Sequence, residues 1–532
     1  MQQKISLKVL PSEAADEAVI KKIIANTAGK KLNDITGYHV NKKSIDARGK
    51  TIWVNLTLNA FFNEPFAPIK IPEFNFKEVT NTPHRVVIIG AGPAGLFAAL
   101  KLIEHGIKPI ILERGKDVRI RRRDLALLNR EGIINNDSNY CFGEGGAGTY
   151  SDGKLYTRSN KRGDIKRILD LFVFFGAEEN ILFDAHPHIG TNKLPQIITA
   201  MRKTITDCGG EFLFNKKVVD ILIKNKKIIA VSTKDGDTFS ADAFILATGH
   251  SARDIFTLLH AKNILIHAKP FALGIRVEHP QNLIDSIQYG PLQTPNLRDL
   301  RDPFLPPASY GLVNQVNGKG VFSFCMCPGG IIAPAATNNG ELVVNGWSPS
   351  KRNNPFANSG MVVQVEEQDV IADQEFSGNK NSPLYLMEFQ KMVEQKAFAA
   401  GGGKFVAPAQ RLVDFTNNKV SASLPDCSYL PGIHSADINN ILPAFIAERL
   451  QIAFKTFGKK MREYLTNEAL IVATESRTSS PVRIPRDAEK LYHPQIENFY
   501  PCGEGAGYAG GIVSAAMDGE RIAAQLALIF RS

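Results

Sequence analysis

The 532-residue sequence predicts an α/β fold, in which a doubly wound, Rossmann-like domain carries an inserted β-rich domain and follows a small N-terminal α+β domain. Three observations lead to this prediction. Residues 85–89 form an apolar run that passes through a glycine-rich turn at 90–95 into an Ala/Leu-rich stretch. A second apolar run follows at 108–112, and the tail at 498–519 repeats the order of strand, glycine turn and helix. The segment from about 265 onward is instead rich in short β-type runs, which indicates a separate inserted domain.

The first turn has the spacing Gly90-x-Gly92-x-x-Gly95. In a dinucleotide-binding turn the first glycine permits the tight turn, the second lets the backbone approach a pyrophosphate, and the third allows close helix–strand packing. The following helix offers unpaired N–H groups and a positive dipole end to the phosphates. Glu113 comes 23 residues after Gly90, where an acid binds the adenosine ribose, so FAD or NAD fits better than NADP. A purely structural turn is the alternative.

Changes of composition divide the chain into five segments. Residues 1–62 are expected to form the N-terminal domain, and the proline-rich stretch 63–83 an extended linker. Residues 84–264 and 490–532 are expected to build the nucleotide-binding domain, with the substrate domain inserted at 265–489.

Apolar periodicity places the individual elements. In the N-terminal domain we expect a strand at 5–10, a helix capped by Ser12 that ends near Gly29, and a strand at 52–60. Further strands are expected at 211–214, 218–223, 228–233, 243–247, 271–277, 311–316, 321–327, 341–345 and 361–365, and helices at 194–209, 383–400 and 439–465.

A second glycine cluster covers residues 142–155. Its small residues, Gly146 among them, would let the backbone touch a planar or phosphate-bearing ligand, with Ser151, Asp152 and Lys154 as polar contacts. An ordinary loop, with Lys154 in solvent, is the alternative.

Two further turns should lie at the same crevice. Thr248 and Gly249 end a buried strand, and ligands gather at the carboxyl ends of strands in doubly wound sheets. The tail motif Gly505-x-Gly507-x-x-Gly510 is followed by only 22 residues, too few for a second nucleotide domain. We expect the tail to return to the first sheet, with a helix N-terminus near Gly511 that points at the same cofactor.

Composition limits the classes of function. The chain is 44% hydrophobic, and its net charge of +10 comes from 63 basic and 53 acidic residues, a mild excess that permits anionic ligands without requiring nucleic acid. The basic run at 114–123 would face cofactor phosphates or an anionic partner, or form a solvated helix face. The N-terminus lacks a secretion signal, and no stretch approaches the roughly 20 apolar residues that span a bilayer. With six cysteines in so long a chain, a cytoplasmic protein without membrane contact is expected.

His186 and His188 are the candidate catalytic residues. They lie two apart in a turn-like stretch, and either imidazole could act as a general acid near neutral pH. A structural or surface histidine is the alternative.

Four other side chains leave alternatives open. Cys325 and Cys327 would share a strand face, which permits a redox dithiol, although cysteines two apart make an awkward disulfide and inert buried thiols are more common. Arg477 and Arg483 could grip an anionic substrate or hold their own loop. The sequence contains no metal-ligand cluster with a recognisable spacing.

These motifs resemble those of known flavoproteins. The segments 90–95, 113–114, 247–249 and 503–504 are similar to the FAD-binding set of oxidoreductases related to glutathione reductase and aromatic hydroxylases. More closely, the chain resembles a bacterial family of uncharacterised FAD-dependent dehydrogenases, in segments 44–48, 142–149, 151–154, 324–330 and 474–481.

The resemblance implies a cofactor arrangement. Val219 would meet the adenine through its backbone, and Glu504 would take a ribityl contact that related proteins often give to Asp. Gly511 and Ile512 would present helix N–H groups to the flavin N1 and O2 edge. Motifs and resemblance together predict these cofactor-binding residues: Gly90, Gly92, Pro93, Gly95, Glu113, Arg114, Gly146, Ser151, Asp152, Lys154, Val219, Thr248, Gly249, Gly503, Glu504, Gly510, Gly511 and Ile512.

The expected function is therefore that of an FAD-dependent oxidoreductase, which passes a hydride through the flavin to or from a small-molecule substrate. The substrate would lie between the flavin and the inserted sheet, and NAD(P)H would bind only transiently. Three alternatives stay open: an NAD(P)H-dependent hydroxylase, an RNA-binding or RNA-modifying flavoprotein, and a flavin-bearing scaffold without turnover.

Overall fold

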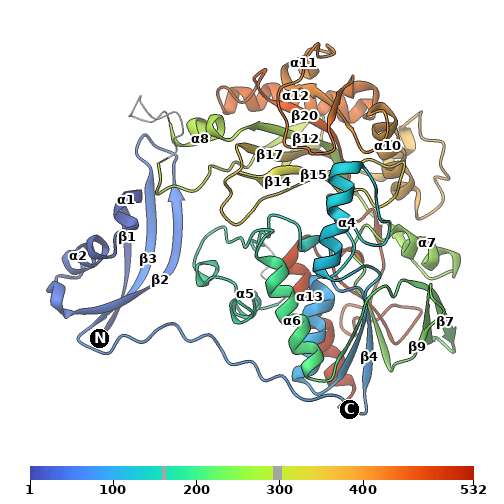
Figure 1. Cartoon of the computed structure of the whole chain (residues 1–532), viewed down its shortest axis with the longest axis horizontal. Helices are drawn as coiled ribbons and strands as arrows, with labels where there is room; N and C mark the ends of the chain where they lie inside the picture. Colours follow the sequence, from blue (N-terminus) through green and yellow to red (C-terminus); the bar gives the residue numbers. More distant parts are fainter. Residues whose placement is uncertain (158–162, 291–301, 532) are drawn as a thin grey trace.

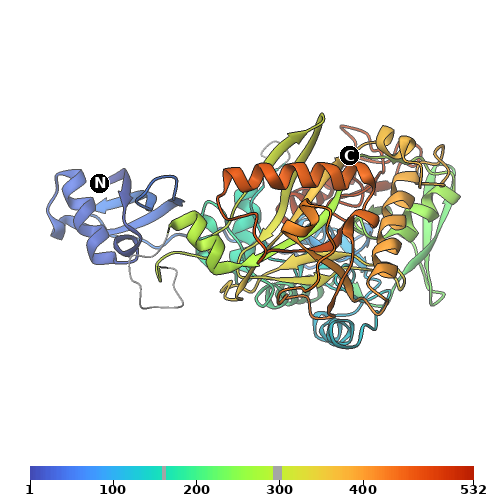
Figure 2. The same ribbon diagram turned by 90° about the horizontal axis from the view of Figure 1, so that it is seen from above.

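The computed structural model describes residues 1–157, 163–290 and 302–531. Figure 1 shows the nucleotide-binding domain below the inserted domain, and the N-terminal domain to one side of both. Figure 2 shows the same N-terminal domain projecting from one end of the molecule. The α/β fold with a parallel sheet confirms the predicted fold class.

The N-terminal domain is an antiparallel sheet in the order β1-β3-β2, covered by two helices. Its strands are β1 (Gln2–Val9), β2 (Ile35–Asp46) and β3 (Trp53–Phe62), and its helices are α1 (Pro11–Ala14), α2 (Glu17–Ala28) and the 3-10 turn η1 (Leu32–Asp34). The strand β2 was not predicted, because few of its side chains are buried and its apolar alternation is weak.

The single helix predicted from Ser12 is wrong, because the structure divides it. The carboxylate of Asp16 accepts hydrogen bonds from the backbone N–H groups of Ala18 and Val19, so a new helix begins after this residue. This second helix, α2, ends at Gly29, whose φ of 64° is the left-handed conformation typical of a helix end.

The segment between β3 and β4 contains neither helix nor strand and runs along the bottom of Figure 1. It is docked rather than free: Val79 is fully buried and its N–H donates to the carbonyl oxygen of Cys208. Phe74 and Phe76 pack on the rings of Phe174 and Phe175. From Phe74 onward the segment is thus part of the surface of the nucleotide-binding domain, whereas Phe66 packs on His39 and Phe61 of the N-terminal domain.

The central sheet has the order β22-β10-β4-β5-β6, and all its neighbouring strands are parallel. Its strands are β4 (Arg85–Ile89), β5 (Lys108–Leu112), β6 (Glu211–Leu213), β10 (Ala243–Leu246) and β22 (Phe499–Pro501). Because β22 pairs with β10, the tail of the chain returns to the first sheet as the sequence predicted.

Helices cover one face of this sheet and a small meander covers the other. The first face carries α3 (Pro93–Glu104), α5 (Ile165–Phe174), α6 (Leu194–Asp207) and α13 (Ile512–Ile529), which Figure 1 shows side by side. The second face carries β7 (Val218–Lys224), β8 (Lys227–Thr233), β9 (Thr238–Phe239) and α7 (Arg253–Ala261). The helix α4 (Val118–Glu131) rises from this domain toward the inserted one.

The inserted domain contains a seven-stranded sheet in the order β13-β14-β17-β12-β20-β18-β19. Its strands are β12 (Phe271–Pro280), β13 (Val313–Val316), β14 (Lys319–Cys327), β17 (Phe356–Val365), β18 (Ala407–Arg411), β19 (Ile433–Ser435) and β20 (Leu470–Glu475). Two short pairs accompany it, β15 (Ile331–Pro334) with β16 (Val344–Trp347) and β11 (His267–Ala268) with β21 (Val482–Arg483).

Helices pack on this second sheet and bury a large apolar core. They are α8 (Gln281–Tyr289), α9 (Glu367–Ala372), α10 (Tyr385–Ala400), α11 (Leu412–Thr416) and α12 (Ala444–Lys460). The helix expected at 439–465 is shorter at both ends. It begins only after Pro443, which precedes its first turn. Across the described ranges, no helix is long and apolar enough to cross a membrane.

Candidate functional site

A cavity of about 370 Å³ lies where the glycine turns meet the inserted domain. This volume is in the range of small-molecule and cofactor sites. Five segments contribute half of the residues that line it: 89–94, 146–148, 247–251, 502–504 and 510–512. The inserted domain contributes the side chains Phe324, Cys325, Asn345, Arg477 and Thr478. The cavity is thus built by both domains.

The turn before α3 is shaped for a phosphate-bearing group. Gly90 has a φ of 107°, and a Cβ there would lie 2.5 Å from the carbonyl oxygen of Ala247. A Cβ at Gly95 would overlap the carbonyl oxygen of Gly90, so both positions require glycine. No side chain among the described residues caps the first turn of α3. Its N–H groups and its positive dipole end therefore stay available to an anion in the cavity.

Glu113 joins the two glycine segments. One carboxylate oxygen accepts from the N–H of Ala91 at 2.9 Å, and the other accepts from Gly115 at 2.8 Å and Gly143 at 2.9 Å. The side chain is buried and lines the cavity. A carboxylate has about four lone-pair sites, so one remains for a ribose hydroxyl. The structure adds a positioning role for Glu113 that the glycine spacing alone does not indicate.

The second glycine cluster is held in place by Arg121, a residue that the sequence analysis did not single out. Arg121 is fully buried on α4. Its guanidinium donates to the carbonyl oxygens of Asn139, Tyr140, Glu144 and Gly146 and to the Thr149 hydroxyl, at 2.8–3.3 Å. A Cβ at Gly146 would lie 3.0 Å from the Cα of Gly92. Arg121 therefore fixes the loop that faces the dinucleotide turn.

The rest of the basic run does not act as one surface. Arg114 pairs with Asp137 at 2.6 Å and Asp254 at 2.9 Å, and its guanidinium stacks on the ring of Phe142. Lys116 pairs with Asp124 at 2.9 Å. Only part of the run, Arg119, Arg122 and Arg123, is exposed. The run thus mixes structural and solvated side chains and gives no specific support to nucleic-acid binding.

Asp152 and Lys154 stand at the edge of the cavity nearest the inserted domain. Asp152 pairs with Arg352 at 2.7 Å, while its Oδ1 atom has no hydrogen-bond partner among the described residues. Burial would raise the pKa of Asp152, but the charges of Lys154 and Arg352 outweigh it and lower this pKa. A buried, ionised oxygen is thus available to a hydrogen-bond donor in the cavity.

Lys154 links the glycine cluster to β14. Its ammonium donates to the carbonyl oxygen of Met326 and lies 3.9 Å from the sulfur of Cys325. Burial lowers the pKa of Lys154, but the neighbouring thiols and Asp152 more than offset this, so the pKa is raised. Lys154 is therefore a cation at the contact of the two domains.

The tail of the chain supplies a second open helix end. Gly511 precedes α13, and no described side chain caps this helix either. Gly510, Gly511 and Ile512 line the cavity together with Gly503 and Glu504. His250, which the sequence analysis did not single out, faces Glu504 at 3.5 Å. Two helix N-termini, one early and one late in the sequence, thus meet at one cavity.

Four predicted residues do not line the cavity; one of them, Gly95, lies against the carbonyl oxygen of Gly90 instead. His186 is exposed and contacts the ring of Tyr156, and His188 bonds the carbonyl oxygen of Ser350 at 3.2 Å. Neither lines the cavity, so their positions do not support the general-acid role. Burial lowers the pKa of His188, which favours the neutral ring. Val219 points outward with 42% of its surface exposed, and its neighbour Val218 lines the cavity instead.

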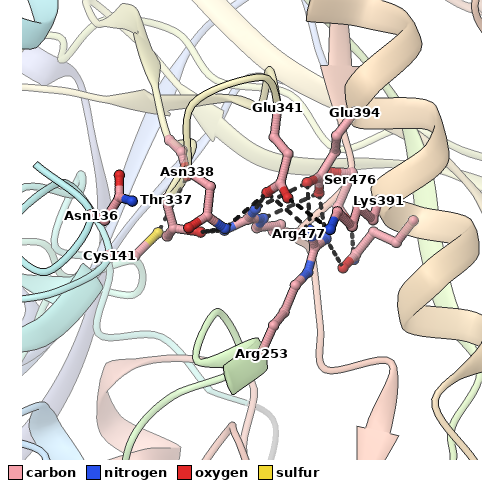
Figure 3. A network of polar contacts seen from close by, with 12 residues as sticks. Asn136, Cys141, Arg253, Thr337, Asn338, Glu341, Lys391, Glu394, Ser476 and Arg477 are labelled. Carbon is pink, nitrogen blue, oxygen red and sulfur yellow. Dashed lines mark hydrogen bonds and ion pairs between the residues drawn. The ribbon is translucent and has the colours of Figure 1, made fainter. Parts of the chain in front are cut away.

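An ion cluster ties the two domains together behind the cavity, as Figure 3 shows. Arg253 of α7 and Arg477, which follows β20, both bond the carboxylates of Glu341 and Glu394. Of the alternatives for Arg477, the structure favours the one in which it holds its loop. Arg483 is exposed and stacks on the ring of Tyr508.

The residues present fit FAD: two uncapped helix ends for phosphate and flavin edges, an acid after β5, and glycines where the backbone must come close. Residues 84–266 match the family described as pyridine nucleotide-disulphide oxidoreductase, and residues 270–478 match the one described as FAD-dependent protein, C-terminal domain-like. Residues 1–61 match a domain of unknown function.

Comparison with solved structures gives distant likenesses. Tetracycline destructase Tet(51) is 12% identical with a TM-score of 0.34, over 84% of this chain and 82% of that one. The flavin-dependent brominase Bmp2 is 12% identical with a TM-score of 0.36, over 84% and 80%. CtdE in complex with FAD is 9% identical with a TM-score of 0.31, over 84% of each chain.

A full-length relative carries the assignment instead. An uncharacterized protein from Clostridium beijerinckii is 38% identical over 526 residues, which cover 96% of this chain and 95% of that protein. The description of the family that residues 270–478 match names FAD, and that of residues 84–266 names an oxidoreductase. The chain belongs to a family of uncharacterised FAD-dependent oxidoreductases.

Proposed function

We propose that this FAD-dependent oxidoreductase transfers a hydride between its flavin and a small-molecule substrate that lies against the inserted domain. One observation carries the proposal. The cavity that the nucleotide-binding turns form continues to side chains of the inserted sheet and its loops, among them Phe324, Asn345 and Thr478. A nicotinamide would bind there only transiently, because the chain contains one complete dinucleotide-binding unit.

Specific residues would hold the cofactor. The first turn of α3, after Gly92, would bind the pyrophosphate, and Glu113 would use its remaining lone pair for the adenosine ribose. Glu504 would take a ribityl hydroxyl, and the first turn of α13, after Gly511, would face the flavin edge. FAD, when bound, supplies the hydride or electron transfer itself.

The chain's own contribution is orientation and charge at the substrate end. Asp152 presents an ionised oxygen without a partner among the described residues, and would orient a substrate through a donated hydrogen bond. Lys154 would offset negative charge that develops beside it. Phe324 and Thr478 line this end of the cavity and would exclude part of the water from it once a substrate is bound.

Replacing Gly90 with alanine should reduce FAD binding by at least about 100-fold. The new Cβ would meet the carbonyl oxygen of Ala247, so the dinucleotide turn must move. Gly176 gives a matched control, because its φ of 104° is nearly that of Gly90 while a Cβ there meets no atom within 4 Å. Flavin retained after gel filtration and titration of FAD into apoprotein measure the effect. Equal losses in both variants would contradict the assigned turn.

The proposed reaction is tested by anaerobic rapid mixing of the holoenzyme with NADH or NADPH, and then with pools of oxidisable metabolites. Loss of the visible flavin absorption with one class of reductant is the expected result. Reduction by a nicotinamide followed by oxygen consumption and hydroxylated product would instead indicate the hydroxylase alternative. A flavin that stays oxidised with every reductant would overturn the proposal in favour of a scaffold.

A further inference from the structure

Two cysteines of β14 lie closer together than a regular strand allows. Alternate residues of a strand are about 6.6 Å apart along its axis, so their side chains share a face without touching. Here the pairing of β14 with β17 shifts register between Phe324 and Cys327, and Cys325 has a φ of 46°. This bulge brings the sulfur atoms of Cys325 and Cys327 to 4.0 Å. A left-handed conformation at a residue other than glycine is strained and often marks a functional position.

Of the two cysteines, one lines the cavity and the other lies behind it. Cys325 lines the cavity between Phe324 and the ammonium of Lys154, and Cys327 is completely buried behind it. The Cys327 thiol lies 3.2 Å from the carbonyl oxygen of Cys325, to which it can donate. A molecule in the cavity therefore reaches Cys325 first, and Cys327 can reach only Cys325.

The charges around the sulfurs favour a thiolate. Lys154 approaches the sulfur of Cys325, and the guanidinium of Arg276 lies 3.6 Å from the sulfur of Cys327 and 2.6 Å from the carbonyl oxygen of Cys325. The Arg276 guanidinium also pairs with Glu475 at 2.7 Å. Burial raises the pKa of Glu475 to about 7 against the charge of Arg276, so this acid balances its arginine only in part.

Charged groups of both signs act on the pair. Lys154 and Arg276 favour the charged form of Cys325, and Asp152 opposes it. Glu475 also faces the pair through Arg276, and burial raises the pKa of this acid. A hydrogen bond from Cys327 is the largest influence that lowers the pKa of Cys325, with Lys154 and Arg276 adding to it against burial.

Four other cysteines of the chain, Cys327 among them, lack this environment. Burial raises the pKa of the Cys208, Cys427 and Cys502 thiols. The same holds for Cys327, whose pKa is raised by burial and by the neighbouring sulfur. The two cysteines thus differ in role: the surroundings of Cys325, which lines the cavity, favour a thiolate, and those of the enclosed Cys327 favour a thiol.

We propose that Cys325 and Cys327 form a redox-active dithiol, in which the Cys325 thiolate reacts with small-molecule disulfides that enter the cavity. This activity goes beyond the proposed hydride transfer and does not depend on it. The thiolate of Cys325 attacks one sulfur of a disulfide RSSR, forms the mixed disulfide Cys325–S–SR and releases RS⁻. The Cys327 thiol then attacks Cys325 Sγ, forms the Cys325–Cys327 disulfide and releases RSH, which takes the proton. The dithiol is oxidised by two electrons and RSSR is reduced to two thiols.

The dithiol is tested with full-length holoenzyme and glutathione disulfide as the probe. In the wild type, peptide mapping without reductant should find a disulfide between Cys325 and Cys327, which dithiothreitol reverses. Cys327→Ser should instead hold glutathione on Cys325 as a stable mixed disulfide. Cys325→Ser should form neither product, and Cys208→Ser, changed outside the cavity, should behave as the wild type. Far-ultraviolet circular dichroism checks that each variant is folded.

Alkylation by iodoacetamide gives an independent readout of the thiolate. At pH 7 Cys325 should react at least about tenfold faster than Cys208, and Lys154→Gln should move the midpoint of its pH profile upward. Equal rates for the two cysteines, or a Cys327→Ser variant without the mixed disulfide, would overturn the proposal. Fast alkylation without any Cys325–Cys327 disulfide would overturn the dithiol in the same way.

Discussion

Replacing Glu394 with alanine is expected to lower the free energy of unfolding by about 4 kcal/mol, because it leaves buried cations without their main partner. Glu394 is fully buried on α10. Its carboxylate accepts from Arg253 at 2.8 Å, from Arg477 at 3.0 and 3.1 Å, and from the Ser476 hydroxyl at 2.6 Å. The variant keeps both guanidiniums inside the protein with only Glu341 to balance them.

The same contact predicts the response to acid. Burial would raise the pKa of Glu394, but the charges of Arg253 and Arg477 outweigh it and lower this pKa from 4.5 to about 2. A lowered pKa stabilises the folded state above pH 4.5, and this contribution disappears as the pH falls from there toward 2. The difference corresponds to about 3 kcal/mol. A Glu394→Gln variant, which does not titrate, should therefore lose less stability than the wild type over this interval.

Urea unfolding of the full-length protein, followed by circular dichroism at several pH values, measures both effects. Gln395→Ala is the control, because Gln395 is exposed on the same helix next to Glu394. The ion cluster joins the two domains, so the two domains of Glu394→Ala should also unfold in separate transitions. A change below about 1 kcal/mol in Glu394→Ala would show that the cluster contributes little.

Much of the nucleotide-binding domain could be predicted because its signals are local. Gly90 and Gly95 must be glycines because a Cβ at either position would meet a backbone carbonyl oxygen close to the turn. Their spacing therefore identifies the turn without knowledge of the rest of the fold. The return of the tail was also predictable. One strand and one helix cannot form a sheet by themselves, so this strand must pair with a sheet that already exists.

Contacts between distant segments could not be predicted in this way. Arg253 and Glu394 are separated by 141 residues, and nothing in either local sequence indicates the other. The position of Cys325 depends on a bulge that breaks the alternation from which the strand was predicted. His186 and His188 show the converse, because a pattern typical of catalytic residues lies outside the cavity.

Arg121 is an intermediate case. The sequence places it on the apolar face of its helix, but its charge is the same as that of the neighbouring arginines. Val118, Arg121, Leu125 and Leu128 are the buried residues of α4, at the spacing of one helix face. In a run of several arginines, the one on the apolar face is the one to expect inside the protein. Charge alone groups Arg121 with the exposed Arg122, whereas helix periodicity separates them.

Replacing Arg121 with alanine is expected to weaken FAD binding by about 100-fold, or about 3 kcal/mol. The change removes five hydrogen-bond contacts to the loop at 139–149 and takes from the carbonyl oxygens of Asn139 and Tyr140 the donor that Arg121 supplies. The loop faces the dinucleotide turn through Gly146 and Gly92, so its displacement should open the wall of the cavity. Titration of FAD into apoprotein measures the affinity, and Arg122→Ala on the same helix controls for the lost charge.

Arg121→Lys separates the shape of the guanidinium from its charge. A lysine ammonium carries three donors at one point and cannot reach acceptors spread from Asn139 to Thr149, so this variant should bind FAD nearly as weakly as Arg121→Ala. If Arg121→Lys instead retained FAD as the wild type does, a single positive charge would be sufficient at this position. The planar fork would then not be what fixes the loop, and the positioning role assigned to Arg121 would be wrong.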